Sequence, residues 1–175
     1  MAMFEASVRV LTISDRAHAG LYEDTAGPAA CALLTESYPA AQITSAIIPD
    51  GISSITEAIQ EARKDNVRII LTLGGTGIAP RDVTPEASAQ LITKDLPGIA
   101  EAIRREGQKT TERAVVSRGV AGVIDADPAQ GIKHPCVLIN LAGSLNAAEV
   151  GTRVVIPLLE HLVMQLDGDK QHDSH

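Results

Sequence analysis

The chain alternates short aliphatic runs with segments that carry a helical pattern, and this alternation limits it to few folds. Ser7 to Ile13 and Val67 to Leu73 are rich in Val, Ile and Leu and predict buried strands, while Gln42 to Ile48 is a weaker strand pattern. Thr25 to Ser37 predicts the first crossover helix and Thr84 to Lys94 the third. The succession predicts a single-domain α/β three-layer sandwich, with a mostly parallel sheet and helices on both faces.

The segments between these elements carry more local signals. Ser54 and Glu57 have the spacing of a capping box, beside an apolar stripe of helical period formed by Ile52, Ile55, Ile59 and Ala62. Val115 to Ile124 contains two glycines and predicts a small hairpin. Asp125 to Pro135 is rich in proline and glycine and predicts a mobile surface loop.

The last part of the chain predicts a strand followed by a long helix. Cys136 to Leu141 is a further buried strand, and Ser144 is placed to cap a helix that Pro157 should bend. We expect one domain over residues 1–166 and a polar C-terminal tail over residues 167–175. His172 and His175 in that tail are expected to lie in a frayed end and to bind no metal.

Composition excludes several classes of function. The 175 residues suit one domain with a substantial core, which must be aliphatic because only 2% of residues are aromatic. The net charge of −7 repels nucleic-acid phosphates, and the few aromatic rings offer no stacking platform. No apolar run has the length of a membrane span and no signal-peptide pattern precedes Val8, which predicts a cytoplasmic protein. Cys31 and Cys136 lack metal or redox spacing and are expected to be buried in a reducing compartment.

A glycine turn follows the strand that ends at Leu73. Glycine reaches backbone conformations closed to other residues and lets N–H groups approach an anion closely. The candidate phosphate cradle consists of Gly74, Gly75, Thr76 and Gly77. Its spacing matches neither the P-loop nor the dinucleotide fingerprint, so a turn that serves geometry alone is the alternative.

The residues after the glycine turn add charge and a helix start. Arg81 is a nearby cation, and Asp82 is the hard oxygen ligand that Mg²⁺ prefers beside phosphate. Thr84 is predicted as the N-cap, Pro85 as the first helical residue and Glu86 as a first-turn acid. Asp82 could instead be a turn residue that bonds its own backbone.

Polar segments follow four of the predicted strands. Ligands of open parallel sheets bind outside the carboxyl ends of the strands, so these segments should share one crevice. They are Ser14-Asp15, Asp50, Gly74 to Asp82, and Gly143-Ser144. Local alternatives remain: Asp50 could cap the following helix, Asp15 could pair with Arg16, and Ser144 could cap a helix while also serving an anion.

Several motifs together resemble one known family. The run from Leu71 to Gly77, continued by Arg81 to Ala87, is similar to the signature of the molybdopterin-binding family of molybdenum cofactor biosynthesis, which includes bacterial molybdopterin adenylyltransferases and the gephyrin G domain. Further matches in family order are Ser14 to Arg16, Ile48 to Asp50, Ala114 to Arg118 with Ala121-Gly122, and Asn140 to Ser144. Two residues of the last motif depart from the family: Ala142 stands where the family usually has proline, and Leu145 where many members have proline or another residue.

The resemblance implies a reaction and a set of partners. It implies adenylylation of molybdopterin by Mg²⁺-ATP with release of pyrophosphate, with Asp50 and Asp82 as the catalytic residues that hold the metal. It also implies phosphate contacts by Gly74 to Gly77 and Arg81. Substrate contacts, with the pterin and nucleotide parts not separated, fall to Ser14, Asp15, Ser117, Gly143 and Ser144. Family members commonly form trimers, so the resemblance implies a homotrimer, and a downstream molybdenum insertion enzyme is the candidate partner.

Two other functions remain open at this level. One is a protein of the same fold that binds molybdopterin without turnover, which the departures at Ala142 and Leu145 favour and the presence of both Asp50 and Asp82 opposes. The other is a scaffold, as the gephyrin G domain also serves; a single short domain without a linker opposes it. Ser117 could also be an ordinary hairpin hydroxyl, because only the resemblance gives it a role.

Overall fold

The computed structural model describes residues 5–168, and a six-stranded sheet forms its centre. The order in the sheet is β2-β1-β3-β6-β5-β4. The strands are β1 (Ser7–Ile13), β2 (Gln42–Ile48), β3 (Ile69–Leu73), β4 (Lys94–Asp95), β5 (Ala121–Ile124) and β6 (Cys136–Leu141). Neighbours among β2, β1, β3 and β6 run parallel, whereas β5 is antiparallel to both β6 and β4.

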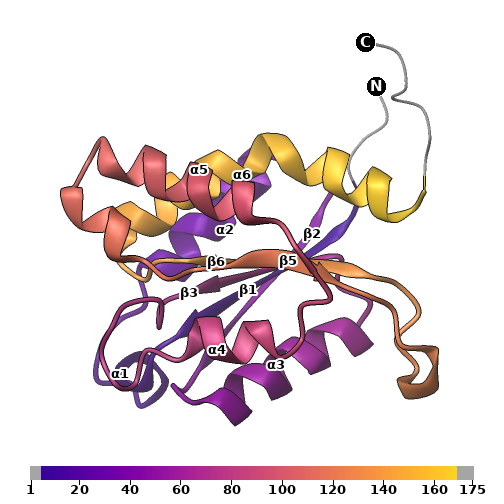
Figure 1. Ribbon diagram of the computed structural model, residues 1–175, viewed down its shortest axis with the longest axis horizontal. Helices are drawn as coiled ribbons and strands as arrows, with labels where there is room; N and C mark the ends of the chain where they lie inside the picture. Colours follow the sequence, from indigo (N-terminus) through magenta and orange to yellow (C-terminus); the bar gives the residue numbers. More distant parts are fainter. Residues whose placement is uncertain (1–4, 169–175) are drawn as a thin grey trace.

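Helices cover both faces of the sheet (Figure 1). One layer consists of α2 (Ala26–Ser37), α5 (Pro97–Gln108) and α6 (Leu145–Leu166). The opposite layer consists of α1 (Asp15–His18), α3 (Ile52–Lys64) and α4 (Thr84–Ala89). Two 3₁₀ turns, η1 (Glu112–Val116) and η2 (Pro128–Gln130), lie in the connections. The predicted mostly parallel three-layer α/β sandwich is therefore confirmed.

The two faces of the sheet carry separate aliphatic cores. Val10 and Leu71 pack with α2 and α6, whereas Leu11 and Ile70 pack with α3. All residues of β3 are buried, because this strand lies between two others and under both helix layers. Burial on both faces explains why its sequence is a continuous aliphatic run rather than an alternating one.

Several local predictions are wrong. The helix predicted over Thr84 to Lys94 ends at Ala89, and Lys94 begins the short strand β4. Val115 to Ile124 is not a hairpin, because its first part belongs to η1 and its second part pairs with β4 and β6. Pairing with distant strands decided this outcome, and no local pattern encodes it.

The capping box predicted at Ser54 and Glu57 is also wrong. α3 begins at Ile52 after Gly51, so Ser54 lies in its first turn, where its hydroxyl donates to the carbonyls of Pro49 and Gly51. The predicted cap at Ser144 is confirmed, because its Oγ accepts the N–H of Ala147 at 3.4 Å.

The remaining predictions concern burial and the chain end. Cys136 is buried and its pKa is raised to about 11 by that burial, whereas Cys31 is only partly buried. Both sulfurs are free thiols. Within residues 5–168, no helix combines the length and apolar character needed to cross a membrane. The tail histidines His172 and His175 lie outside the described residues.

Candidate functional site

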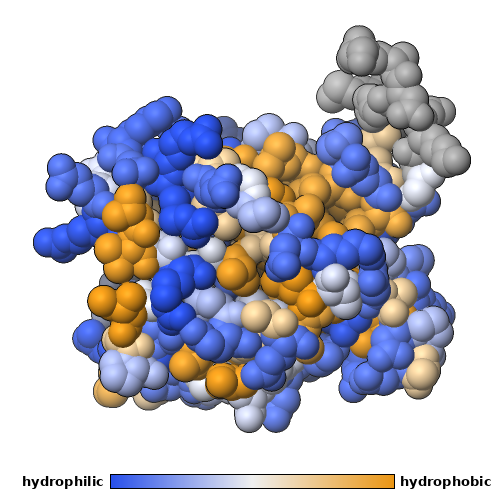
Figure 2. Space-filling model, viewed as in Figure 1, coloured by the Kyte–Doolittle hydropathy of each residue, from blue (hydrophilic) through white to orange (hydrophobic). Residues whose placement is uncertain are grey.

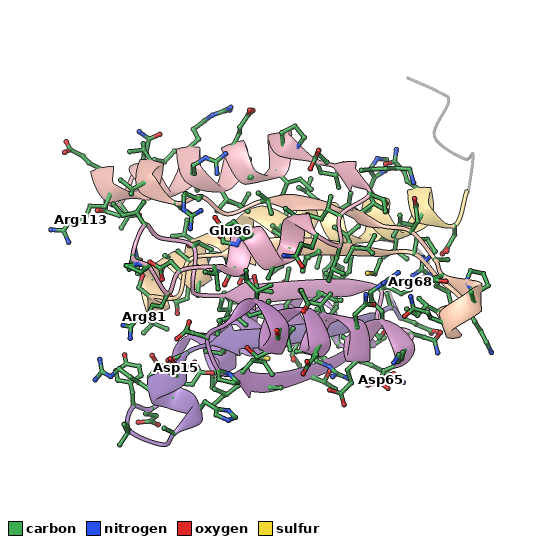
Figure 3. All side chains as sticks on the ribbon, turned by 60° about the horizontal axis from the view of Figure 1, so that its bottom comes forward. Asp15, Asp65, Arg68, Arg81, Glu86 and Arg113 are labelled. Carbon is green, nitrogen blue, oxygen red and sulfur yellow. The ribbon has the colours of Figure 1, made fainter. Side chains whose placement is uncertain are left out.

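The carboxyl ends of four strands meet at one edge of the sheet, as the sequence predicted. The chain after β1 is tied to the end of β2, because the N–H of Ser14 donates to the carbonyl of Ile48 at 2.9 Å. The chain after β3 is tied to the end of β6, because the N–H of Gly74 donates to the carbonyl of Leu141 at 3.0 Å. Figure 3 places Asp15 and Arg81 together at this edge, with Asp65 and Arg68 at the opposite one.

A cavity of about 620 Å³ opens at this edge. Its lining includes much of the predicted set: Gly74, Gly75, Thr76, Gly77, Asp82, Ser117, Gly143 and Ser144. The same cavity is lined by residues that the sequence did not single out, among them Ile103 and Arg104 of α5 and Arg113 of η1. No motif marked them, because the sequence of α5 has the pattern of an ordinary amphipathic helix. Only the packing of α5 against the loops brings one of its sides to the cavity.

A second, smaller hollow of about 120 Å³ adjoins the cavity and shares Gly75 and Asp82 with it. Its lining contains the rest of the predicted set: Ser14, Asp15, Asp50 and Arg81. The structure therefore divides the single predicted crevice into two neighbouring spaces. The larger one is mostly walled by loops and α5, and the smaller one gathers the carboxylates.

Asp15 and Asp50 fix one another across the ends of two strands. The N–H of Asp15 donates to Oδ2 of Asp50 at 3.0 Å, and the N–H of Asp50 donates to Oδ1 of Asp15 at 2.9 Å. Asp50 thus does not cap α3, whose N-cap is Gly51. Asp15 makes no ion pair with Arg16, whose guanidinium lies over the ring of Tyr22.

The carboxylate of Asp82 is held by its own loop. Its Oδ2 accepts the N–H of Ala79 at 2.9 Å, and its N–H donates to the carbonyl of Ala79 at 2.9 Å. This is the turn role weighed from the sequence, but the side chain also lines both hollows, so the two roles coexist. Among the described residues, Oδ1 of Asp82 and Oδ1 of Asp50 accept no hydrogen bond.

The donor set fits Mg²⁺ bound jointly by protein and phosphate. Residues 5–168 contain no cluster of three or more metal-binding side chains, so the protein has no complete cage of its own. Mg²⁺ is usually held by one or two carboxylates, with water and substrate phosphate as further ligands. Asp50 and Asp82, each with an oxygen to spare and both lining the smaller hollow, match that pattern.

The glycine turn needs glycine at two positions for different reasons. Gly74 has a φ of +106°, and a Cβ there would lie 2.6 Å from the carbonyl oxygen of Ile13. Gly75 has a φ of +67°, and a Cβ there would overlap Oγ1 of Thr84. That hydroxyl donates to the carbonyl of Gly74 at 2.9 Å, so Thr84 closes the turn and is not the predicted N-cap, a position that Val83 occupies.

Buried polar contacts join the site to the sheet. Asn140 on β6 donates from Nδ2 to the hydroxyls of Thr72 and Ser88, each at 2.9 Å, and its Oδ1 accepts the N–H of Val120 at 3.2 Å. The hydroxyl of Ser117 makes two long contacts of 3.4 Å: it donates to Oγ1 of Thr76 and accepts the N–H of Gly119. The sequence could have indicated the buried hydrogen bonds of Asn140, because this residue is a polar amide inside an otherwise aliphatic run.

These observations define a class: an α/β protein with a candidate ligand site at the carboxyl edge of a mostly parallel sheet. A family model described as a probable molybdopterin binding domain matches residues 9–161. The chain belongs to this molybdopterin-binding family of molybdenum cofactor biosynthesis, and the resemblance noted in its motifs is confirmed.

Known relatives agree with this assignment. The chain is 36% identical over 161 residues to the Drosophila melanogaster molybdenum cofactor synthesis protein cinnamon, a match that covers 91% of this chain and 25% of that protein. It is 32% identical over 158 residues to a Helicobacter pylori molybdopterin adenylyltransferase, covering 89% of this chain and 85% of the relative. It spans 47% of a bifunctional molybdenum cofactor biosynthesis protein of Synechococcus elongatus, so it corresponds to one part of several longer relatives.

Solved structures share the whole fold. A molybdopterin biosynthesis protein from Mycobacterium abscessus superposes with a TM-score of 0.81 at 33% identity, covering 93% of this chain and 97% of that one. The tungsten cofactor synthesizing protein MoaB from Pyrococcus furiosus superposes with a TM-score of 0.83 at 28% identity, covering 94% and 99%.

Proposed function

We propose that this protein transfers AMP from ATP to the terminal phosphate of molybdopterin and releases pyrophosphate, with Mg²⁺ as the metal. The observation that carries the proposal is the position of Asp50 and Asp82 in one hollow directly beside the glycine turn of a larger cavity. The obstacle in a reaction between two phosphate groups is the repulsion between their negative charges. Carboxylates next to a phosphate cradle suit such a reaction, because they can hold a metal cation that offsets this repulsion.

The glycine turn supplies donors for phosphate oxygens. Among the described residues, the N–H groups of Gly75, Thr76 and Gly77 donate to no other group, although the turn lies beside the cavity. The N-terminus of α6 lines the same cavity through Ser144 and Asn146, and it offers further N–H groups and a positive dipole end. Arg81 adds a cation in the smaller hollow.

The acidic residues would hold the metal, and the chemistry then needs no catalytic base. The attacking phosphate oxygen is already ionised near pH 7, so no side chain must remove a proton from it. A Mg²⁺ ion bound there would neutralise charge on the phosphate groups. Asp50 and Asp82 would hold the ion, and the free N–H groups of the turn would hold the phosphate oxygens in line for transfer.

The larger cavity suits the flat ring system of a pterin. Apolar side chains form much of its wall, including Ile78, Ile103, Val116 and Val150. Arg104 and Arg113 also line it and add positive charge, which suits an anionic ligand in a protein of net charge −7. Substrate contacts by Ser117, Gly143 and Ser144 would come from the same wall.

The proposal includes self-association as a homotrimer. Figure 2 shows apolar residues gathered on the face that carries α6 and the β5 side of the sheet. A hollow of about 270 Å³ lies there and is lined by Leu96, Val123, Leu162 and Leu166, among others. The three leucines are partly exposed, and exposed apolar surface is commonly covered by another chain.

The test is incubation of the protein with ATP, Mg²⁺ and molybdopterin, followed by assay of pyrophosphate and adenylylated pterin. Both products should appear in equal amounts and depend on Mg²⁺. An Asp65→Asn variant is the matched control, because Asp65 is an acidic residue at the opposite edge of the sheet, paired with Arg9. Absence of both products from the unmodified protein would refute the proposed activity.

A protein that binds molybdopterin without turnover is the second candidate. The departures at Ala142 and Leu145 favour it, because Ala142 lines the cavity and Leu145 is the first residue of α6. Tight binding of molybdopterin by the unmodified protein, with no pyrophosphate released from Mg²⁺-ATP, would support this candidate.

A further inference from the structure

The side chain of Arg118 joins the two ends of the loop that carries Asp82. Its Nε donates to the carbonyl of Gly77 at 2.8 Å, and its Nη2 donates to the carbonyl of Asp82 at 2.6 Å. The backbone N–H of Arg118 donates to the carbonyl of Thr76 at 2.8 Å. One residue thus bonds three carbonyls of the segment from Thr76 to Asp82, from a position 36 residues beyond Asp82 in the chain.

Glu86 holds the guanidinium of Arg118 from the other side. Both oxygens of Glu86 accept from Arg118, through Nη1 to Oε1 and through Nη2 to Oε2. The hydrogen bond from Arg118 lowers the pKa of Glu86 below its usual value, so the carboxylate remains charged at neutral pH. Glu86 lies in the first turn of α4, and Figure 3 shows it on that helix. The loop is therefore fastened to α4 through Arg118.

This fastening bears on the direction of the Asp82 carboxylate. The turn closed by Ala79 and Asp82 orients the carboxylate relative to the loop only. The bond from Arg118 to the carbonyl of Asp82 ties that turn to α4 and to the chain before β5. Loss of the bond would loosen the turn and leave it free to shift relative to Asp50.

Arg118 itself lines neither hollow. It differs in this from Arg81, which lines the smaller hollow and is a candidate for direct phosphate contact. An effect of Arg118 on the reaction must then pass through the loop.

We propose that Arg118 is a positioning residue that fixes the glycine turn and Asp82 in the geometry needed for phosphate transfer, with Glu86 as its anchor. The part that concerns the reaction rests on the proposed adenylylation. The guanidinium is suited to this role, because its N–H groups point in fixed directions toward two carbonyls and a carboxylate at once. Lysine keeps the charge but cannot reproduce that arrangement.

The experiment compares Arg118→Lys with Arg68→Lys. Arg68 is the matched control, because it also joins a carbonyl, that of Pro135 at 3.0 Å, to a carboxylate, that of Asp167 at 2.7 Å, but at the opposite edge of the sheet. In Arg118→Lys we expect amide hydrogen exchange at Ala79 and Asp82, followed by NMR, to become at least about tenfold faster. Arg68→Lys should leave both amides unchanged.

A second measurement follows the reaction. Misplacement of a reacting group by about 1 Å costs on the order of a hundredfold in rate, so Arg118→Lys should lower single-turnover adenylylation by between about tenfold and a hundredfold. The Mg²⁺ concentration for half-maximal rate should rise, while the unfolding midpoint stays near that of Arg68→Lys. Glu86→Gln keeps the carbonyl bonds and should have a smaller effect of the same kind.

The two measurements separate the possible failures. Unchanged exchange at Ala79 and Asp82 in Arg118→Lys would overturn the positioning role, whatever the rate. A large loss of rate without faster exchange would also overturn it, because that result indicates direct contact with substrate. If the unmodified protein has no adenylylation activity, the proposed function fails by itself, and the exchange measurement still decides whether Arg118 fixes the loop.

Discussion

Replacement of Asp82 by asparagine tests the central electrostatic argument. Asparagine keeps the shape of the side chain and an oxygen that can accept the N–H of Ala79, so the turn should persist. The change removes one negative charge from a position that lines both hollows. The expected result is a large loss of rate with little loss of stability.

The size of the effect follows from charge and exposure. Two unit charges about 4 Å apart interact by roughly 4 kcal/mol at the effective dielectric constant of a protein surface, about 20. That energy equals nearly a thousandfold in rate, at about 1.4 kcal/mol for each factor of ten. Asp82 is only partly buried, so water screens part of the interaction. We therefore expect single-turnover adenylylation to fall by at least about a hundredfold.

The assay measures adenylylated pterin in a single turnover, alongside urea unfolding. Asp50→Asn should behave in the same way, because its amide oxygen can still accept the N–H of Asp15. Stability should change by less than about 1 kcal/mol in both variants, as for an exchange of one good hydrogen-bonding side chain for another. Near-normal rates in both variants would show that the carboxylates serve only local structure, and the metal assignment would be withdrawn.

Three further predictions address the turn, the late loop and assembly. Gly75→Ala should destabilise the protein by about 3 kcal/mol in urea unfolding, because it adds an overlap with Thr84 to backbone strain, whereas Gly20→Ala, with a similar φ of +72° and open space, should cost about 1 kcal/mol. Ala142→Pro should tighten molybdopterin binding in titrations by up to about 1 kcal/mol, because the N–H of Ala142 donates to no described residue and proline pre-organises the loop that presents Ser144. Light scattering should give the mass of a homotrimer.

Each of these predictions has a contrary outcome. Equal losses in the two glycine variants would mean that the hydroxyl of Thr84 moves aside at little cost. Weaker pterin binding by Ala142→Pro would show that the backbone there follows a path closed to proline, and Gly143 and Ser144 would lose their support as substrate contacts. A monomer at micromolar concentration would refute the trimer.

Local sequence patterns were sufficient to predict the strands whose ends form the site. The aliphatic runs at Ile69 to Leu73 and Cys136 to Leu141 became central strands, because only a strand covered on both faces favours such continuous apolar sequence. Once parallel strands are assigned, their carboxyl ends must meet at one edge. The convergence of Asp50, Asp82 and the glycine turn was therefore predictable before any coordinates.

Local patterns failed where distant segments compete for the same group. Thr84 has the sequence of an N-cap, but its hydroxyl instead closes the glycine turn onto the carbonyl of Gly74. Val115 to Ile124 contains hairpin signals, yet β5 pairs with β4 and β6, and all of its residues are buried. Propensity differences of a few tenths of a kcal/mol are easily exceeded by such burial.

The sequence by itself determined the class of fold, the edge at which the candidate site lies and the carboxylates and glycines available there. These features follow from the hydrophobic periodicity of the chain and from the backbone conformations open to glycine, and both are set by residues close together in the sequence. Only the tertiary structure decided that the crevice divides into two hollows, that α5 walls the larger one, and that Arg118 fastens the loop of Asp82 to Glu86. The physical reason is that many side chains can satisfy a given carbonyl or carboxylate, and the packing of distant elements selects which one comes within reach.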